Sequence, residues 1–169
     1  MINVQVELIR PGAGGDLDAV RDLRRTVFVQ EQGVPESVEM DERDGDCFHL
    51  SLREKDTQCL LATGRMLPEG RIGRMAVRTE HRRRGLGQRV LRGLLACAAD
   101  RGLRRVSLHA QKDAVAFYTA AGFSVCGDDF IEAGILHTPM ERSLEPPQRT
   151  LASVLDELGL PLTEFAQAQ

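Results

Sequence analysis

The residues best suited to chemistry lie in a charged turn between a short apolar stretch and a long amphipathic one. The turn contains Arg82, Arg83 and Arg84 and closes with Gly85-Leu86-Gly87. A helix that starts here leaves backbone N–H groups without partners, and its aligned peptide dipoles add positive charge. Glycines lack Cβ, so an anion can come close to the backbone. The turn therefore predicts a phosphate or pyrophosphate site, although Arg-rich turns are also common as solvated corners.

Two other phosphate-binding motifs are excluded. The sequence contains no G-x-x-x-x-G-K-[ST], and Val90 stands where the third glycine of G-x-G-x-x-G would follow Gly85 and Gly87. A second glycine-rich stretch, residues 12–15, has Leu17 at its third glycine position. We interpret that stretch as a simple loop before a helix with Asp16 as its N-cap.

Hydrophobic periodicity predicts the elements that position the charged turn. A strand at Met75-Ala76-Val77 precedes the turn, a helix begins at Leu86, and a short strand follows at residues 106–109. One face of the helix carries Leu86, Val90, Leu91, Leu94, Leu95 and Ala98. The two strands of such a crossover are expected to be parallel.

Three strands before the turn are predicted to be antiparallel, because they follow one another through short turns; they span residues 48–52, 59–67 and 71–78. Further strands are expected at residues 4–8 and 135–144, and another opens at residues 123–125, whereas residues 128–134 are expected to be a polar connection. A helix after Asp16 is expected to end near Gly33. We predict an α/β (α+β) fold: a mixed, mostly antiparallel twisted sheet of about six to seven strands with a central parallel β-α-β crossover and helices on both faces.

An acidic segment spans residues 31–46, where seven carboxylates face only Arg43. One interpretation is a solvated loop; the other is a wall that attracts the cation of an amine substrate. His49 follows this segment on the polar alternation of a strand, so we expect a hydrogen-bonding or exposed residue rather than a metal ligand.

Composition narrows the class of protein. The chain has 169 residues with 42% apolar and 28% charged residues, a net charge of −3, and 4% aromatics. These values disfavour nucleic-acid binding. No apolar run reaches the ~18 residues of a membrane span, and no signal peptide is evident. The four cysteines form no C-x-x-C. We therefore expect a cytoplasmic protein with reduced thiols, no metal and no membrane partner.

The charged turn resembles a family signature. Arg82-x-x-Gly85-x-Gly87 after a strand is similar to the [RQ]-x-x-G-x-[GA] motif of the GNAT family of acetyl-CoA-dependent N-acyltransferases. A-x-x-F-Y-x-x-x-G-F, at 114–123, is a second hallmark of the family. F-V-x-E-Q at 28–32, followed by E-x-D at Glu39 and Asp41, resembles one of its subgroups.

The resemblance covers roughly residues 4–144. It implies a GNAT domain at 1–145 and an extension at 146–169 that lies outside the usual fold. We expect this extension to pack on its own domain or on another subunit, as in a homodimer. Its amphipathic helix is marked by Leu151, Val154, Leu155 and Leu158.

The resemblance also implies roles for residues. Backbone groups of the 75–77 strand would bind the pantetheine arm and the acyl carbonyl, and the signature amides would bind the pyrophosphate. Tyr118 would protonate the departing thiolate, and Gln111 stands near the position of a family asparagine that binds pantetheine. The implied cofactor-binding residues are Met75, Ala76, Val77, Arg82, Arg83, Arg84, Gly85, Leu86, Gly87, Gln88, Gln111 and Phe117.

The reaction implied is acetyl transfer from acetyl-CoA to a primary amine of a small molecule or peptide. A lysine-like amine has a pKa near ~10.4, so some group must take its proton. Glu39 and Asp41 are the candidates, and a main-chain N–H of residues 75–77 could stabilise the oxyanion. The alternative is a non-catalytic acyl-CoA-binding sensor or interaction module. A nucleic-acid binder using Arg82–Arg84 is disfavoured by the acidic net charge.

Overall fold

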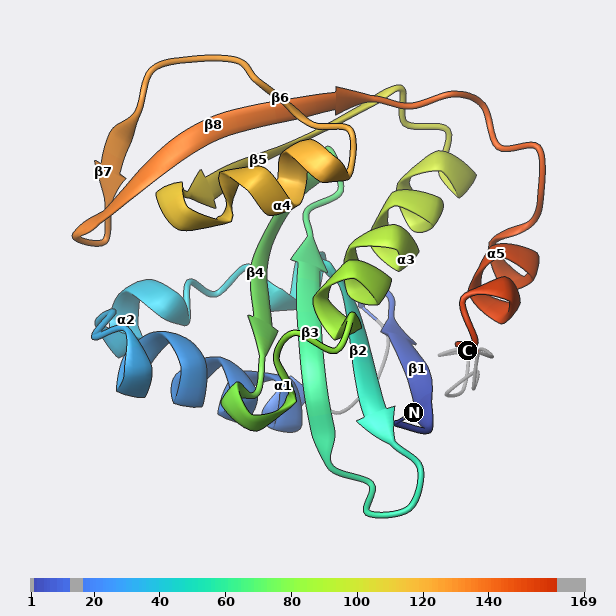
Figure 1. The fold of residues 1–169 in the computed structure, drawn as a ribbon, viewed down its shortest axis with the longest axis horizontal. Helices are drawn as coiled ribbons and strands as arrows, with labels where there is room; N and C mark the ends of the chain where they lie inside the picture. Colours follow the sequence, from blue (N-terminus) through green and yellow to red (C-terminus); the bar gives the residue numbers. More distant parts are fainter. Residues whose placement is uncertain (1, 13–16, 161–169) are drawn as a thin grey trace.

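The computed structural model describes residues 2–12 and 17–160. The Asp16 helix cap, residues 13–15 of the glycine-rich stretch and the last nine residues of the extension lie outside the described residues. Within the described ranges, eight strands form one sheet in the order β1-β2-β3-β4-β5-β8-β6, with β7 paired to β8 (Figure 1). The strands are β1 (Val4–Ile9), β2 (Phe48–Glu54), β3 (Leu60–Met66), β4 (Arg71–Val77), β5 (Arg105–Gln111), β6 (Ser124–Val125), β7 (Phe130–Glu132) and β8 (Ile135–Ser143).

The sheet is mostly antiparallel, and its parallel pair is β4 with β5. The helix α3 (Leu86–Asp100) joins these two strands, which is the β-α-β crossover that the sequence predicted. The predicted fold class is therefore confirmed.

The strand count differs from the prediction because residues 128–134 are not merely a polar connection. Phe130–Glu132 forms β7, which pairs antiparallel with β8. Ala133 and Gly134 close the hairpin with φ angles of 52° and 76°. Positive φ at both central residues is the geometry of a type I′ turn, which is one of the two types favoured in two-residue hairpins. Three residues between turn signals are too short to show alternation, so sequence periodicity missed this strand.

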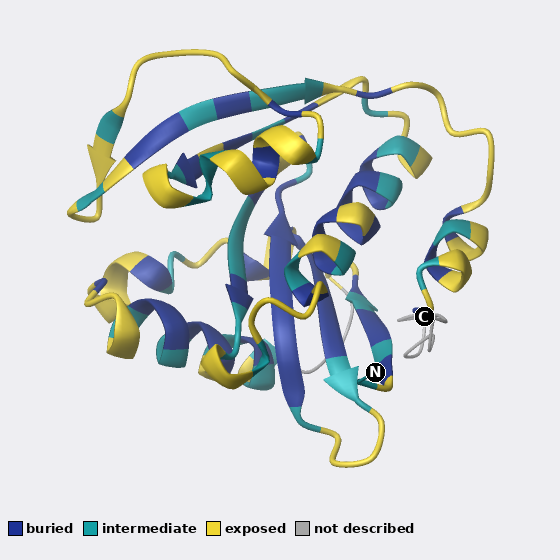
Figure 2. Cartoon of the chain, viewed as in Figure 1, coloured by how far each residue is buried: buried dark blue, intermediate teal, exposed yellow. Residues whose placement is uncertain are grey.

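Helices cover both faces of the sheet (Figures 1 and 2). The apolar face of α3 is buried against β2, β3 and β4 as predicted, and Leu91, Leu94 and Ala98 are fully buried. On the other face, α1 (Leu17–Arg24) packs on β3 and β4. Two separate apolar clusters form the core, one on each side.

The predicted first helix is built in two parts. After α1 the chain continues as a π-helical segment, η1 (Arg25–Glu31), and turns at Gly33 with φ 72°. Val27 and Phe28 of this segment are buried. A short helix, α2 (Glu36–Glu39), and a 3-10 turn, η2 (Asp44–Asp46), follow.

The remaining helices lie near the ends of α3 and β5. A 3-10 turn, η3 (Thr79–His81), leads to α3, and η4 (Lys112–Ala114) with α4 (Val115–Ala120) follows β5. The helix of the extension, α5 (Leu151–Glu157), packs on α3 of the same chain. Leu155 is fully buried there and approaches Gly93, where a Cβ would lie 3.4 Å from Leu155 Cδ2.

Two findings concern the described part of the chain alone. None of its helices is both long enough and apolar enough to cross a membrane. No group of three or more His, Cys, Asp or Glu side chains in it is placed to hold a metal ion.

Candidate functional site

The parallel strands β4 and β5 separate partway along their length. Their described ladder pairs Arg71 with Ser107 and Ile72 with Leu108, and ends there. Just beyond, Arg74 has φ 51° and the β3–β4 register shifts, so β4 carries a bulge. Bulges bend a strand and increase its twist. The bend opens a gap beside residues 73–77, where the backbone edge of β4 is available to another chain or ligand.

The glycine turn lies beyond the end of β4 and starts α3. Gly85 is the N-cap with φ 79°, and no side chain caps the helix there. A Cβ at Gly87 would lie 3.6 Å from Val77 Cγ2 and 3.7 Å from Phe117 Cζ, so the glycine keeps open the space between them. Unpaired N–H groups at the start of a helix of 15 residues suit a phosphate. The residues present therefore fit the pyrophosphate of a coenzyme A thioester.

The three predicted arginines of the turn differ in their contacts. Arg82 Nε donates to the Val77 carbonyl at 2.9 Å, and its Nη2 donates to Glu31 Oε1 at 2.9 Å. Arg82 thus braces the turn against the end of η1. Arg83 and Arg84 are exposed beside it.

The other residues expected around the cofactor lie on the neighbouring elements. Leu86 is buried, so only its backbone can meet a ligand, whereas Gln88 is exposed on the first turn of α3. Met75 and Val77 pack toward α3, and Ala76 packs in the core cluster beneath α1.

Tyr118 is buried on α4 and contacts two aromatic neighbours edge-on. Its ring centroid lies 5.0 Å from that of Phe117 and 5.8 Å from that of Phe123. Phe117 is 39% exposed and faces Gly87, so it is available to a ligand at the turn. Burial raises the pKa of Tyr118 to about 12. The phenol is therefore protonated at neutral pH and able to donate a hydrogen bond.

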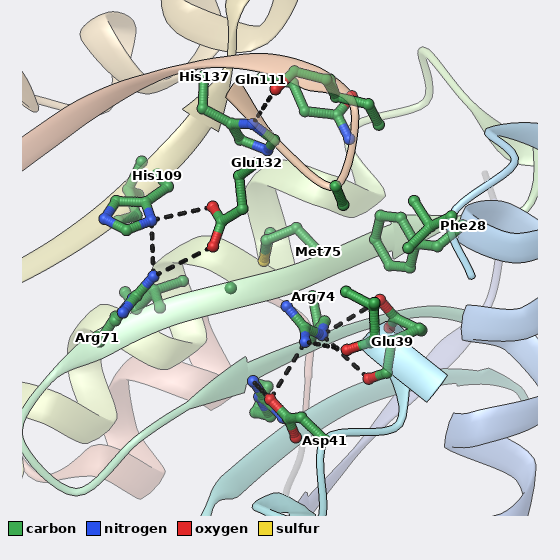
Figure 3. A pocket seen from close by; sticks show the side chains of 18 of the residues that line it. Phe28, Glu39, Asp41, Arg71, Arg74, Met75, His109, Gln111, Glu132 and His137 are labelled. Atoms are coloured by element: carbon green, nitrogen blue, oxygen red, sulfur yellow. Dashed lines mark hydrogen bonds and ion pairs between the residues drawn. The ribbon is translucent and has the colours of Figure 1, made fainter. Parts of the chain in front are cut away.

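A cavity of about 380 Å³ opens beside the gap between β4 and β5. Tyr118 lines this cavity. The bulged part of β4 also lines it, together with residues of α2, β5, β7 and β8 (Figure 3). Both signs of charge are represented in its lining. The carboxylates are Glu39, Asp41 and Glu132, and the guanidinium groups are Arg43, Arg65, Arg71 and Arg74.

The acidic segment divides into two groups. Glu31, Glu36, Glu42 and Asp46 are exposed, as a solvated loop would have them, whereas Glu39, Asp41 and Asp44 pair with arginines. Glu39 is 3% exposed, and its two oxygens meet Arg24 Nε at 2.8 Å and Arg74 Nε at 3.2 Å. Burial raises the pKa of Glu39. Asp41 accepts from Arg65 through both oxygens, at 2.7 and 2.9 Å. Although burial opposes the shift, this pairing lowers the pKa of Asp41 well below its usual range.

Asp44 completes the same network from η2. Its Oδ1 accepts from Arg24 Nη1 at 2.7 Å and from Arg65 Nη1 at 3.2 Å, while its Oδ2 accepts from Arg21 Nε at 3.1 Å. The Asp44 carbonyl is 2.8 Å from Nε2 of the buried His49. His49 is thus a hydrogen-bonding residue of the core, as expected.

Gln111 lies at the end of β5, beside the gap. Its Nε2 donates to Oε1 of Gln32 at 2.8 Å, which links β5 to the end of η1. The predicted contact of Gln111 with pantetheine would replace this link.

Two histidines of the cavity had no place in the sequence interpretation. His109 of β5 and His137 of β8 both contact Phe130 of β7, with ring centroids 4.7 and 5.9 Å away. His109 Nδ1 is also 2.6 Å from Arg71 Nη2 and 3.1 Å from Glu132 Oε2 (Figure 3). In the sequence, the two histidines appear only as polar residues in alternating strand patterns. Their imidazole rings come together at Phe130 only because β7 forms a hairpin with β8.

Comparison with known proteins identifies the class. Residues 16–144 match the sequence model described as Acetyltransferase (GNAT) domain. The chain is 34% identical over 120 residues to YjcF of Bacillus subtilis strain 168, described as an uncharacterized N-acetyltransferase; the match covers 70% of this chain and 86% of that protein. The chain belongs to the GNAT acetyltransferase family.

Solved structures agree in fold. An acyl-CoA N-acyltransferase from Pseudomonas aeruginosa superposes with a TM-score of 0.73 and 29% identity, covering 82% of this chain and 99% of that one. ElaA of Escherichia coli gives a TM-score of 0.68 and 29% identity, covering 84% and 99%.

Proposed function

We propose that this protein transfers an acetyl group from acetyl-CoA to a primary amine by direct attack of the amine on the thioester. The observation that carries the proposal is the free edge of β4. This edge runs from the glycine turn to the cavity that Tyr118 also lines. A pyrophosphate at the turn and a thioester at the cavity would lie along one strand.

The chain's own residues supply binding and polarisation. Backbone N–H groups at Gly85–Gly87 would hold the pyrophosphate, and backbone groups of Met75–Val77 would pair with the pantetheine arm. Acetyl-CoA, when bound, supplies the activated acyl carbonyl. A β4 N–H next to that carbonyl would stabilise its developing negative charge, and Tyr118 would donate a proton to the sulfur that leaves.

Acetyl-CoA titration by calorimetry tests the proposal with one substitution in the turn. Gly87→Glu places a carboxylate where the phosphates would lie, and the space around Gly87 admits its Cβ. Gly85 is left unchanged, because its φ of 79° would strain any other residue. Ala152→Glu adds the same charge on the exposed face of α5 and serves as the control.

We expect micromolar binding by the wild type and by Ala152→Glu, with at least a tenfold loss in Gly87→Glu. Circular dichroism checks that each protein is folded. A folded wild type that binds no acetyl-CoA would refute the proposal. If Gly87→Glu still binds acetyl-CoA as the wild type does, the pyrophosphate does not bind at this turn.

A further inference from the structure

His137 lies in the cavity wall, between paired residues of two neighbouring strands. On β8 it pairs with Gln111 of β5 on one side and with Phe130 of β7 on the other. Side chains of directly paired residues share a face of the sheet. The imidazole is therefore placed beside the end of β5, next to the gap where the thioester would lie, and it is only 9% exposed (Figure 3).

The hydrogen bond of the His137 ring defines its neutral tautomer. Nδ1 lies 2.7 Å from the Ile135 carbonyl oxygen, which can only accept a hydrogen bond. Nδ1 must therefore carry the proton, and in the neutral ring Nε2 keeps its lone pair. Among the described residues, none donates a hydrogen bond to Nε2. A free lone pair on a wall of the cavity is the arrangement that a general base requires.

The other basic groups of the cavity are already engaged. Both oxygens of Glu39 meet arginines, and both oxygens of Asp41 accept from Arg65. Nδ1 of His109 lies between Arg71 and Glu132. Arginines hold each of these groups, whereas none of the described residues donates a hydrogen bond to His137 Nε2.

The surroundings of His137 hold its ring in place. Phe130 stacks on it with an interplanar angle of 23°. The neighbouring Thr138 donates to Asp129, which also pairs with Lys112 of η4 at 2.7 Å. The titratable and charged groups on the elements around the ring are Arg71 of β4, His109 of β5, Lys112 of η4, Tyr118 of α4, Asp129 before β7, and Glu132 of β7.

We propose that His137 is the general base of the reaction and takes the proton from the attacking amine through Nε2. This role rests on the acetyltransferase function proposed above. At neutral pH the amine arrives as an ammonium, and His137 Nε2 takes one of its protons. The lone pair that this frees forms the new N–C bond, and the C–S bond breaks with its electron pair on sulfur. Tyr118 Oη gives its proton to the sulfur and regains one from the nitrogen through solvent. The products are an amide and the free thiol, and solvent takes the proton from His137.

His137→Asn separates catalysis from positioning. The asparagine amide nitrogen stands near the place of Nδ1 and can still donate to the Ile135 carbonyl, but nothing replaces Nε2. His137→Gln is the second variant if the first does not fold, as judged by circular dichroism. His109→Asn removes the other imidazole of the cavity and is the matched comparison. Release of CoA thiol is measured with acetyl-CoA and each of n-butylamine, putrescine and lysine from pH 5 to 9.

We expect His137→Asn to lower kcat/KM about 100-fold at pH 7, the size typical of general-base catalysis. The wild-type profile should rise with pH and level off once an imidazole is neutral. The profile of the variant should keep rising about tenfold per pH unit, because only the neutral amine then reacts and its pKa is near ~10.4. His109→Asn should keep the levelling, whatever its rate.

Each other outcome identifies what fails. Levelling that persists in His137→Asn would overturn the role of His137 and leave the acetyltransferase function intact. A pH profile that stops levelling off only in His109→Asn would also overturn the role of His137 and leave the acetyltransferase function intact. Absence of acetyl-CoA binding by calorimetry would overturn the proposed function itself. Binding without thiol release to any amine would define a non-catalytic module and overturn both proposals.

Discussion

Replacing Asp44 with asparagine should destabilise the protein in a way that depends on pH. Asp44 is 3% exposed and accepts hydrogen bonds from three arginines, of which Arg24 is fully buried. Although its own burial opposes the shift, the hydrogen bond from Arg24 lowers the pKa of Asp44 from the ordinary 3.8 to about 2. The asparagine keeps the shape of the side chain and removes the charge that these guanidinium groups require.

The lowered pKa sets the size and direction of the effect. It corresponds to about 2 kcal/mol of stability at neutral pH. Removing one partner of a buried pair typically costs about 3 to 5 kcal/mol, so we expect a loss near ~3 kcal/mol at pH 7. Because the folded pKa lies below the unfolded one, this stability is present above pH 4 and is lost as the pH falls toward 2. The difference between wild type and Asp44→Asn should shrink by about 1 kcal/mol at pH 3.

Urea unfolding followed by circular dichroism at pH 7, 5 and 3 measures both quantities. Asp46→Asn is the matched control, because Asp46 lies in the same turn and is exposed. Carboxylates outside this arginine network titrate equally in the two proteins and cancel in the difference. The reasoning would be refuted by an Asp44→Asn protein as stable as Asp46→Asn, or by a difference that stays constant with pH.

Two further substitutions test the extension and the cavity. Leu155→Ala should cost about 2 to 5 kcal/mol in urea unfolding, because the side chain is fully buried against α3, whereas Asp156→Ala on the exposed face should cost little. Equal midpoints would show that α5 does not stabilise the domain. Tyr118→Phe should lower kcat for acetyl transfer about 100-fold and leave the dissociation constant of acetyl-CoA within twofold, measured by thiol release and calorimetry. An unchanged kcat would exclude Tyr118 as the proton donor.

Local patterns predicted the elements around the glycine turn with little error. The periodicity from Leu86 onward predicted α3 and its buried face, because one helix face must be apolar to pack on a sheet. The connection of two apolar strands through that helix predicted their parallel pairing. These features depend on neighbours within a few residues, so they can be predicted from the sequence alone.

Features that depend on residues far away along the chain could not be predicted from local sequence patterns. Glu39, Asp41 and Asp44 looked like a free acidic segment, because their arginine partners lie 15 to 35 residues away along the chain. The bulge at Arg74 depends on the register with β3 and has no local signal. Both decide what the cavity offers a substrate.

By itself, the sequence of this protein determined most of the helix and strand order, the glycine turn before α3 and the family, since each is encoded in the spacing of nearby residues. The tertiary structure alone decided which charged side chains pair with one another and which remain able to contact a substrate. It paired the acidic segment with buried arginines, folded α5 onto α3, and used β7 to hold His137 beside the gap between β4 and β5. The physical reason is that burial and long-range pairing set the reactivity of a side chain, and neither is a property of its neighbours in sequence.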